Sequence, residues 1–263
     1  MSRLASTFAA QTTTRLVTYV TAGDPDLARS GEILLALDRA GADVIEVGVP
    51  FSDPIADGPV IQRASERALV AGGTLATTLE MVRDVRDRIS APIVLFTYVN
   101  PVTRMGTETF VGRAAEAGVD GVLLLDLPIE EASAMRHALD ARGIDVIFLV
   151  SPTTTDARLA EAARLGRGFL YAISRLGVTG ARDVVATSAE PLVARLRKVS
   201  QLPVALGFGI SRPEHVREVM GYADAAVVGS ALVQVIADAA ANGADVPAAV
   251  ERFVRWLKGT ARA

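Results

Sequence analysis

Cysteine is absent from this sequence, and histidine and lysine occur only twice each among its 263 residues. The absence of cysteine excludes disulfides, thiolate metal sites and a cysteine nucleophile. Lys198 and Lys258 fall in helical stretches away from any predicted strand end, so a Schiff-base lysine has no candidate. His137 and His215 are also predicted to lie in helices, as exposed residues, and two histidines cannot build a His-rich metal centre. The side chains left for chemistry are mainly carboxylates.

A strong net charge and long apolar runs are also missing. The formal net charge is -3 and the pI is near 5.5, which argues against the basic surface of a nucleic-acid-binding protein. Residues 1–15 contain no apolar stretch of the signal-peptide type. The most apolar later stretch, residues 224–237, is broken by Ser230 and Gln234 and is too short to span a bilayer. We therefore expect a cytoplasmic protein that binds neither nucleic acid nor a membrane.

The pattern of apolar residues predicts the fold. Half of the residues are hydrophobic, and a chain of this length suits one large α/β domain better than two small ones. Short β-branched runs alternate with segments whose apolar residues recur at helical spacing. The runs predicted as strands are residues 16–21, 43–48, 92–98, 121–126, 145–150, 168–173, 203–208 and 224–229. Eight strands, each followed by a helix, predict a single (β/α)8 TIM-barrel domain over residues 1–263, with a doubly wound open sheet as the alternative.

Recurring glycines and two insertions refine this prediction. The segments AGAD, AGVD and RGID, at residues 40–43, 117–120 and 142–145, each place a glycine where a helix ends and a strand begins. Longer insertions follow predicted strands two and six, at residues 49–59 and 174–187. Both follow the C-terminal end of a strand, where such barrels carry their active sites, so we expect these two segments to be active-site loops.

An acidic residue, Glu46, interrupts the second predicted strand, DVIEVG. Side chains alternate along a strand, so Val44, Glu46 and Gly48 share one face while Ile45 and Val47 share the other. The branched side chains of Ile45 and Val47 suit contact with the surrounding helices. Glu46, on the opposite face, is therefore expected to point into the mouth of the barrel. Burial there raises the pKa of an unpaired carboxyl group toward neutrality and fits it to exchange protons. The alternative is a structural glutamate in a salt bridge at the end of the barrel.

The loop after this strand adds Asp53 and Asp57. Their sequences, SDP and ADG, are ordinary turn sequences, so each aspartate alone is typical of a turn residue. Their position next to a strand-borne glutamate, on the face where barrels do chemistry, makes them candidates for catalysis. A cluster of carboxylates can also bind a divalent ion. The sequence supplies none of the neutral ligands that such a site recruits, so we expect no metal.

Glycine turns near the end of the chain indicate a phosphate site. GFGIS at residues 207–211 and VGSAL at residues 228–232 follow predicted strands seven and eight, and each is expected to open a helix. Backbone amides at such helix starts bind anions, and barrels typically build a phosphate site from these two loops. GVTG at residues 177–180 adds a third glycine turn. The alternative for each is a tight turn between strand and helix. Together they favour carboxylate acid–base chemistry on a phosphorylated substrate.

Several segments, in order from about residue 16 to the end, resemble the tryptophan synthase alpha chain family. They are TAGDP at 21–25, GADVIEVGVPFSDPIADGPVIQRA at 41–64, YVNP at 98–101, DLP at 126–128, SRLGVTGAR at 174–182 and GFGIS at 207–211. The resemblance implies a TIM barrel that cleaves indole-3-glycerol phosphate to indole and glyceraldehyde 3-phosphate in tryptophan biosynthesis. It also implies an α2β2 heterotetramer in which indole passes to a beta chain that carries pyridoxal phosphate. No cofactor is expected in this chain.

The same resemblance implies roles for individual residues. Glu46 matches the family's acid/base, and Asp57 matches its second catalytic carboxylate. Asp53 matches the loop position that faces the beta chain. Thr179 lies on the family's mobile loop, whose closure would contact Asp57 and exclude water. The remaining substrate positions correspond to Tyr171 and Phe208 in the cavity and, at the phosphate, to Gly180, Gly209, Gly229 and Ser230.

Two departures from the family and three rival functions stay open. The segment before strand one is short, and Thr18 stands where a proline is common, which leaves the packing of the N-terminus undecided. One rival is a free-standing lyase that needs no partner. Another is a catalytically idle barrel that binds the phosphate ligand and activates its partner. A sugar-phosphate isomerase also fits the barrel and the anion site, although no lysine or histidine lies at a strand end.

Overall fold

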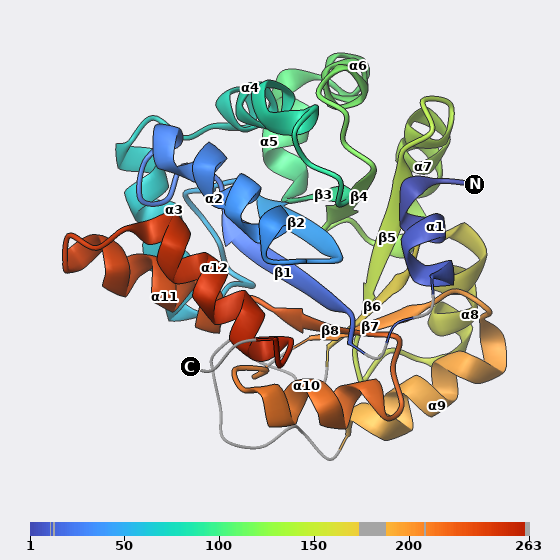
Figure 1. The fold of residues 1–263 in the computed structure, drawn as a ribbon. Helices are drawn as coiled ribbons and strands as arrows, with labels where there is room; N and C mark the ends of the chain where they lie inside the picture. Colours follow the sequence, from blue (N-terminus) through green and yellow to red (C-terminus); the bar gives the residue numbers. More distant parts are fainter. Residues whose placement is uncertain (11, 13, 174–187, 208, 261–263) are drawn as a thin grey trace.

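Eight parallel strands pair in sequence order and close into a barrel, because β8 pairs with β1 (Figure 1). The computed structural model describes the whole chain apart from residues 11, 13, 174–187, 208 and 261–263. The strands are β1 (Leu16–Thr21), β2 (Val44–Gly48), β3 (Ile93–Thr97), β4 (Gly121–Leu124), β5 (Asp145–Val150), β6 (Leu170–Ile173), β7 (Val204–Gly207) and β8 (Ala225–Val228). The predicted (β/α)8 barrel is confirmed, and each predicted run contains the strand observed.

Helices surround this barrel. Those before or between the first strands are α1 (Arg3–Ala9), α2 (Leu27–Arg39), α3 (Pro59–Val70), α4 (Leu75–Arg86), α5 (Val99–Met105) and α6 (Thr107–Glu116). Those that follow β4 are the short 3-10 helix η1 (Ile129–Glu131), α7 (Ser133–Asp140), α8 (Asp156–Leu165), α9 (Ala189–Val199), α10 (Pro213–Met220), α11 (Ser230–Ala241) and α12 (Val246–Leu257). Among the described residues, the helices in excess of one per strand are α1, the second α-helix that follows each of β2, β3 and β8, and η1 after β4.

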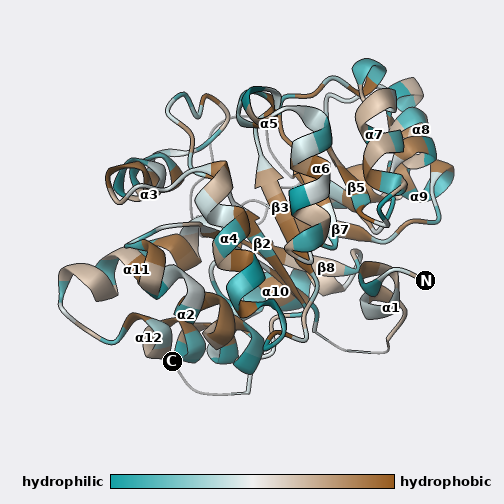
Figure 2. Cartoon of the chain, turned by 90° about the horizontal axis from the view of Figure 1, so that it is seen from above, coloured by the Kyte–Doolittle hydropathy of each residue, from teal (hydrophilic) through white to brown (hydrophobic). Residues whose placement is uncertain are grey.

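Strand residues divide into two apolar layers, as the alternation predicts. The outward-facing Ile45 and Val47 of β2 pack in the layer between strands and helices, whereas Val44 packs in the barrel interior. Figure 2 shows the strands as a largely hydrophobic centre, with hydrophilic colour on the outer parts of the helices. Across neighbouring strands Glu46 is in register with Tyr19 of β1 and Val94 of β3. The acidic residue therefore lies on the inward face of the barrel.

Three of the predicted helix ends use glycine as expected. Gly41, Gly118 and Gly143 have φ values of 84°, 75° and 71°, in the left-handed region that favours glycine. Each returns the chain from a helix to the start of the next strand. The short βα units at these positions therefore come directly from the local sequence.

The N-terminal helix α1 packs across the end of the barrel opposite the catalytic face. Leu4 is fully buried in the interior cluster together with Val17 and Phe169. Arg15 holds the following turn, since its guanidinium donates to the carbonyl of Ala10 at 2.6 Å and to that of Asp224 at 2.9 Å. These contacts hold α1 against this end of the barrel.

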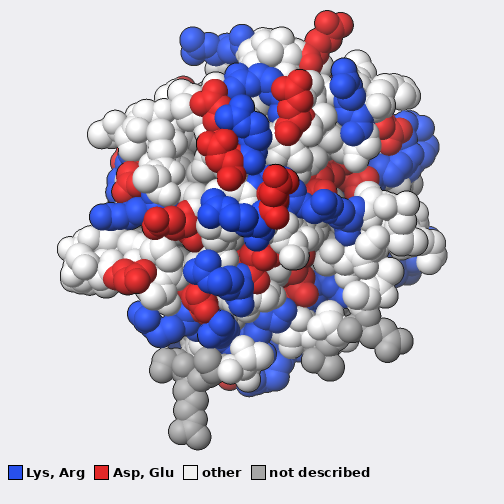
Figure 3. All heavy atoms as spheres, turned by 45° about the horizontal axis from the view of Figure 1, so that its top comes forward, with Lys and Arg blue, Asp and Glu red and all other residues white. Residues whose placement is uncertain are grey.

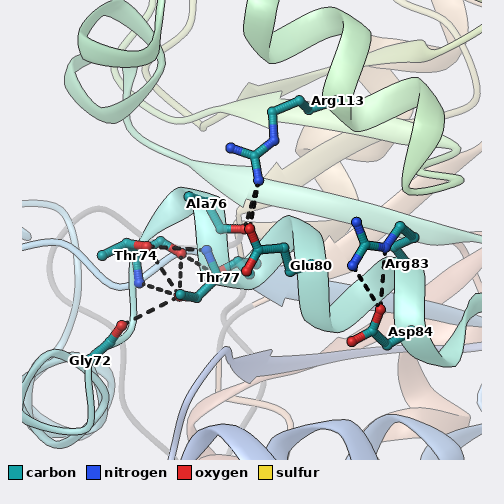
Figure 4. Close-up of polar contacts among 9 residues, drawn as sticks. Gly72, Thr74, Ala76, Thr77, Glu80, Arg83, Asp84 and Arg113 are labelled. Carbon is teal, nitrogen blue, oxygen red and sulfur yellow. Dashed lines mark hydrogen bonds and ion pairs between the residues drawn. The ribbon is translucent and has the colours of Figure 1, made fainter.

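The outer surface carries interspersed charges. On the face shown in Figure 3, Lys and Arg side chains lie among Asp and Glu side chains and form no uniform basic patch. Figure 4 shows two such contacts around α4: Arg113 pairs with Glu80 at 3.0 Å, and Arg83 with Asp84 at 3.1 Å. Exposed pairs of this kind contribute only about 0 to 1 kcal/mol each. Thr74 begins α4 with a reciprocal capping box, which fixes where the helix starts.

Two further observations concern the described part of the chain. No helix within it is long and apolar enough to cross a membrane. The prediction that both histidines are exposed is wrong for His215, which is 5% exposed and accepts a hydrogen bond from the backbone amide of Ser211. It lies in the first turn of α10.

Candidate active site

Glu46 lies in the barrel mouth, on the inward face of β2. Its side chain is fully buried, and within the described residues neither carboxyl oxygen has a hydrogen-bond partner. Burial raises the pKa of Glu46 from 4.5 to about 8. The salt-bridged alternative is therefore excluded for the part of the chain that the structure describes. Burial thus favours the protonated form of this carboxyl group.

Asp57 is the second carboxyl group of the site. It lies in the loop after β2, just before α3, and is 6% exposed. The Tyr98 hydroxyl, at the end of β3, donates to Asp57 Oδ2 at 3.1 Å and accepts from the amide of Ala56 at 3.2 Å. The Tyr98 ring also packs on Phe51, with centroids 5.0 Å apart. Burial raises the pKa of Asp57 to about 6, and the Tyr98 hydrogen bond opposes part of that rise.

Two tyrosines flank these carboxyl groups in equivalent positions. The side chain of Tyr19 in β1 lies across Gly48 of β2. A Cβ atom built onto Gly48 would be 2.1 Å from the tyrosine hydroxyl, so only glycine leaves room for this side chain. Tyr171 of β6 lies across Gly207 of β7 in the same way, with a corresponding distance of 2.7 Å. Burial is the main cause that raises the pKa of both phenols, and the charges of the nearby carboxylates add to it. Both hydroxyls therefore keep their protons.

A pocket of about 310 Å³, lined by both apolar and polar side chains, opens at the C-terminal ends of β4 and β5. Leu125 and Leu149 form its inner wall and also pack against the interior cluster of the barrel. The other lining residues are Leu124, Asp126, Leu127, Pro128, Ile129, Phe148, Val150, Thr154 and Arg158. The apolar inner wall suits a flat aromatic group.

The predicted glycine turns lie on the same end of the barrel, after β7 and β8. Gly209 has a φ of +80°, in the left-handed region. Gly229 directly precedes α11, and Ser230 is the first residue of that helix. The turn after β7 does not open a helix, because α10 begins only at Pro213. Of these two turns, only the one after β8 leads directly into a helix and presents its first backbone amides.

The other predicted site residues divide into two groups. Thr179, Gly180 and Phe208 lie outside the described residues, as does the loop 174–187. Asp53 is exposed and accepts a hydrogen bond from the Ser52 hydroxyl at 2.6 Å. The structure thus places Asp53 apart from the buried Asp57, although both belong to the loop 49–59. Within the described residues no group of three or more acidic or histidine side chains is arranged to hold a metal.

Sequence reasoning missed Tyr19 and Tyr98 and the pocket wall of Leu125 and Leu149. A signal for Tyr19 existed, since strand alternation places it on the same inward face as Glu46. Tyr98 comes directly after β3, at the end of the barrel that carries the chemistry. The leucines gave no such signal, because an inward leucine near a strand end is also typical of ordinary core.

Together these features define the chain as a (β/α)8 barrel with two buried carboxyl groups at its mouth, the end at which barrel enzymes carry their active sites. The two carboxyl groups have pKa values raised to about 8 and about 6, which suits one as an acid and the other as an anion near neutral pH. The chain belongs to the tryptophan synthase alpha chain family, whose sequence model matches residues 5–262.

Relatives and solved structures agree with this family. The tryptophan synthase alpha chain of Geotalea uraniireducens is 49% identical over 266 residues, covering 100% of this chain and 99% of that protein. The one from Geobacter sulfurreducens is 52% identical, with 89% and 90% covered. A Mycobacterium tuberculosis tryptophan synthase structure matches with a TM-score of 0.90 and 37% identity, covering 100% of this chain and 99% of that one. A Pyrococcus furiosus tryptophan synthase a2b2 complex matches with a TM-score of 0.87 and 41% identity, covering 93% and 98%.

Membership of this family gives the reaction. The chain is a carbon–carbon lyase of tryptophan biosynthesis that cleaves indole-3-glycerol phosphate to indole and glyceraldehyde 3-phosphate. The resemblance in the sequence motifs is thereby confirmed. The sugar-phosphate isomerase is set aside by the same finding.

Proposed function

We propose that Glu46 and Asp57 carry out the retro-aldol cleavage, as the proton-transferring acid/base and as the stabilising anion. The observation that supports this most is the separation of their pKa values, raised to about 8 and about 6 in one barrel mouth. At pH 7, between these two values, Glu46 is then mainly protonated and Asp57 mainly ionised. Both groups are then in the state that the reaction requires.

The reaction begins with protonation of the indole ring. Glu46 donates its proton to carbon 3, which makes the bond to the hydroxyl-bearing carbon breakable and leaves positive charge at the ring nitrogen. Ionised Asp57 stabilises that charge. The Glu46 carboxylate then takes the proton of the hydroxyl group as an aldehyde forms. The electrons of the broken carbon–carbon bond return to the ring, which gives indole, and Glu46 ends protonated as it began.

The substrate lies across the barrel mouth, with its indole ring at one side and its phosphate at the other. Its aromatic ring packs against Leu125 and Leu149, whose pocket is large enough for a bicyclic group. Its phosphate binds at Gly229 and Ser230, where the first amides of α11 and the helix dipole favour an anion. Tyr171 completes the cavity beside β6. By resemblance to the family, Gly209 and Gly180 contribute to the phosphate site and Phe208 to the cavity wall.

The loop 49–59 connects the site to a partner. We assign Asp53 to contact with a tryptophan synthase beta chain, in an α2β2 complex like that of the Pyrococcus furiosus relative. The neighbouring Ile55 is 83% exposed, and burial against another protein would remove this apolar surface from water. Asp57, a few residues further, is buried in the site, so a partner that moves this loop also moves a catalytic carboxylate.

The remaining parts of the proposal follow the family. Pyridoxal phosphate belongs to the beta chain, and this chain needs no cofactor of its own for the cleavage. Residues 1–263 act as one catalytic domain in the cytoplasm. Thr179 and the loop 174–187 close over the site and exclude water during the reaction.

Indole release by purified Glu46→Gln and Asp57→Asn proteins tests the catalytic roles. Each variant should lose at least two orders of magnitude in kcat, because general acid–base catalysis typically contributes about 100- to 10,000-fold. Glu218→Gln, an exposed residue of α10, is the matched control and should retain wild-type activity. Near-normal turnover of Glu46→Gln would remove its assigned role.

Measuring indole release with and without a beta chain distinguishes the three remaining hypotheses: a complex-dependent lyase, a free-standing lyase and a catalytically idle subunit. Complex-dependent catalysis predicts slow indole release by the isolated chain and a marked increase on addition of the beta chain. A free-standing lyase would be fast alone, and an idle subunit would bind phosphate ligands without release of indole. Asp53→Ala should reduce the stimulation while leaving the slow isolated rate unchanged.

A further inference from the structure

Tyr19 lies between the proposed phosphate site at Gly229 and the strand that carries Glu46. It has no role in the proposed mechanism. It is the inward-facing residue of β1 that is in register with Glu46, and its side chain is 6% exposed. A buried tyrosine keeps a polar hydroxyl only where a partner can satisfy it, whereas phenylalanine fills the same volume without that requirement.

The direction of the Tyr19 side chain is fixed by contacts on two sides. At its base, an added Cβ on Gly229 would be 3.6 Å from Tyr19 Cβ and 3.7 Å from Cδ1. At its tip, an added Cβ on Gly48 would be 2.1 Å from the hydroxyl oxygen. The ring therefore extends from the turn after β8 to the end of β2. These are the sites assigned to the phosphate and to the strand of the proton-transferring Glu46.

Neighbouring apolar residues hold the ring in this direction. Phe96 of β3 packs edge-on against it, with centroids 5.3 Å apart and an interplanar angle of 79°. Ile61 and Ala64 of α3 and Val233 of α11 complete the cluster around it. The hydroxyl is therefore presented at a set position over the barrel mouth. Burial and the nearby carboxylates raise the pKa of this hydroxyl more than the neighbouring Thr21 side chain lowers it, so it stays protonated and can act as a hydrogen-bond donor.

The order of groups along the substrate matches this arrangement. In indole-3-glycerol phosphate the phosphate is followed by the glycerol carbons, of which two carry hydroxyl groups, and then by the indole ring. A molecule that reaches from the turn at Gly229 to Glu46 must pass its glycerol carbons over the Tyr19 ring. Glu46 handles the hydroxyl next to the bond that breaks. The middle hydroxyl, which survives in glyceraldehyde 3-phosphate, is left without a partner in the mechanism.

We propose that the Tyr19 hydroxyl donates a hydrogen bond to this middle hydroxyl of the glycerol chain. The inference rests on the proposed placement of phosphate and carboxylates. Tyr19 is then a substrate-binding residue that recognises the glycerol part of the ligand separately from its phosphate and its indole ring. The bond is present before and after carbon–carbon cleavage, so it contributes to binding and not to proton transfer.

Ligand binding to the full chain with Tyr19→Phe tests this assignment, because phenylalanine retains the ring and its contact with Phe96. Three probes are measured by calorimetry: glycerol 3-phosphate, inorganic phosphate and indole. We expect the Kd of glycerol 3-phosphate to rise roughly 2- to 10-fold, as for loss of one net hydrogen bond, while the other two are unchanged. In the cleavage reaction KM should rise by a similar factor, with kcat and its pH profile unchanged.

Two controls make the result decisive. Tyr222→Phe, a partly buried tyrosine that precedes β8 at the opposite end of the barrel, should leave all three affinities unchanged. An unchanged affinity of Tyr19→Phe for glycerol 3-phosphate overturns the inference, and so does an equal loss for all three probes, which would indicate a displaced ring. If the wild-type chain releases no indole, the proposed function fails. This outcome is distinct from failure of the Tyr19 assignment, which is measured by ligand binding.

Discussion

The unpaired burial of Glu46 predicts an inverse relation between pH and stability that Glu46→Gln should abolish. The pKa of Glu46 is raised from 4.5 to about 8 on folding. The folded chain therefore holds a proton that the unfolded chain releases between these two values. The contribution of Glu46 to the unfolding free energy is fully present below pH 4.5 and is lost progressively as the pH rises toward 8. The full loss is about 5 kcal/mol, because each unit of pKa shift corresponds to 1.36 kcal/mol.

The variant isolates this effect because the other titrating groups are shared. Glutamine fills the same volume and never ionises, so its burial cost does not depend on pH. Relative to Glu46→Gln, the wild-type chain should lose about 3 kcal/mol of unfolding free energy between pH 4.5 and pH 7 and somewhat more by pH 8. Urea unfolding of both proteins at pH 4.5, 7 and 8, monitored by circular dichroism, measures this difference. A difference that stays constant with pH, or grows in favour of the wild type, would refute the unpaired burial of Glu46.

Three further predictions follow from the same structure. The pH profile of kcat/KM for indole release should be bell-shaped, falling below about pH 6 as Asp57 is protonated and above about pH 8 as Glu46 ionises. Tyr98→Phe removes a hydrogen bond that favours ionised Asp57, so the acidic limb of that profile should move up by roughly one pH unit, and an unmoved limb would contradict the contact. Leu4→Ala leaves a cavity under the barrel and should lower the unfolding free energy by about 2 to 5 kcal/mol in urea titrations, with kcat unaffected at temperatures where the chain stays folded.

The features that sequence could predict are those set by local periodicity. Alternation along DVIEVG was enough to place Glu46 inward, because a strand gives each side chain only two directions. Glycines at helix ends and the repeated βα units predicted the barrel and each strand boundary to within two residues. The direction of the Glu46 pKa followed from the same reasoning, since an inward carboxyl group in an apolar strand has no adjacent cation.

Features that depend on distant segments could not be predicted in this way. Asp57 reads as a turn residue, and its burial depends on Tyr98, which comes from the next strand of the barrel. His215 reads as a surface residue of a helix, and its burial follows from the packing around the start of α10. Tyr19 reads as ordinary strand core. Its orientation becomes informative only when Gly48 and Gly229 are seen on either side of it.

The most direct test of the account is a titration of the Glu46 side chain itself. Carbon-13 labelling of glutamate side-chain carboxyl groups, with Glu46→Gln used to assign the resonance, allows its protonation to be followed by NMR from pH 4 to 9. A buried Glu46 predicts a transition near pH 8, with the carboxyl group protonated at pH 7. A transition near the ordinary value for glutamate, about 4.3, would show an ionised group at neutral pH and contradict its role as the acid that protonates indole.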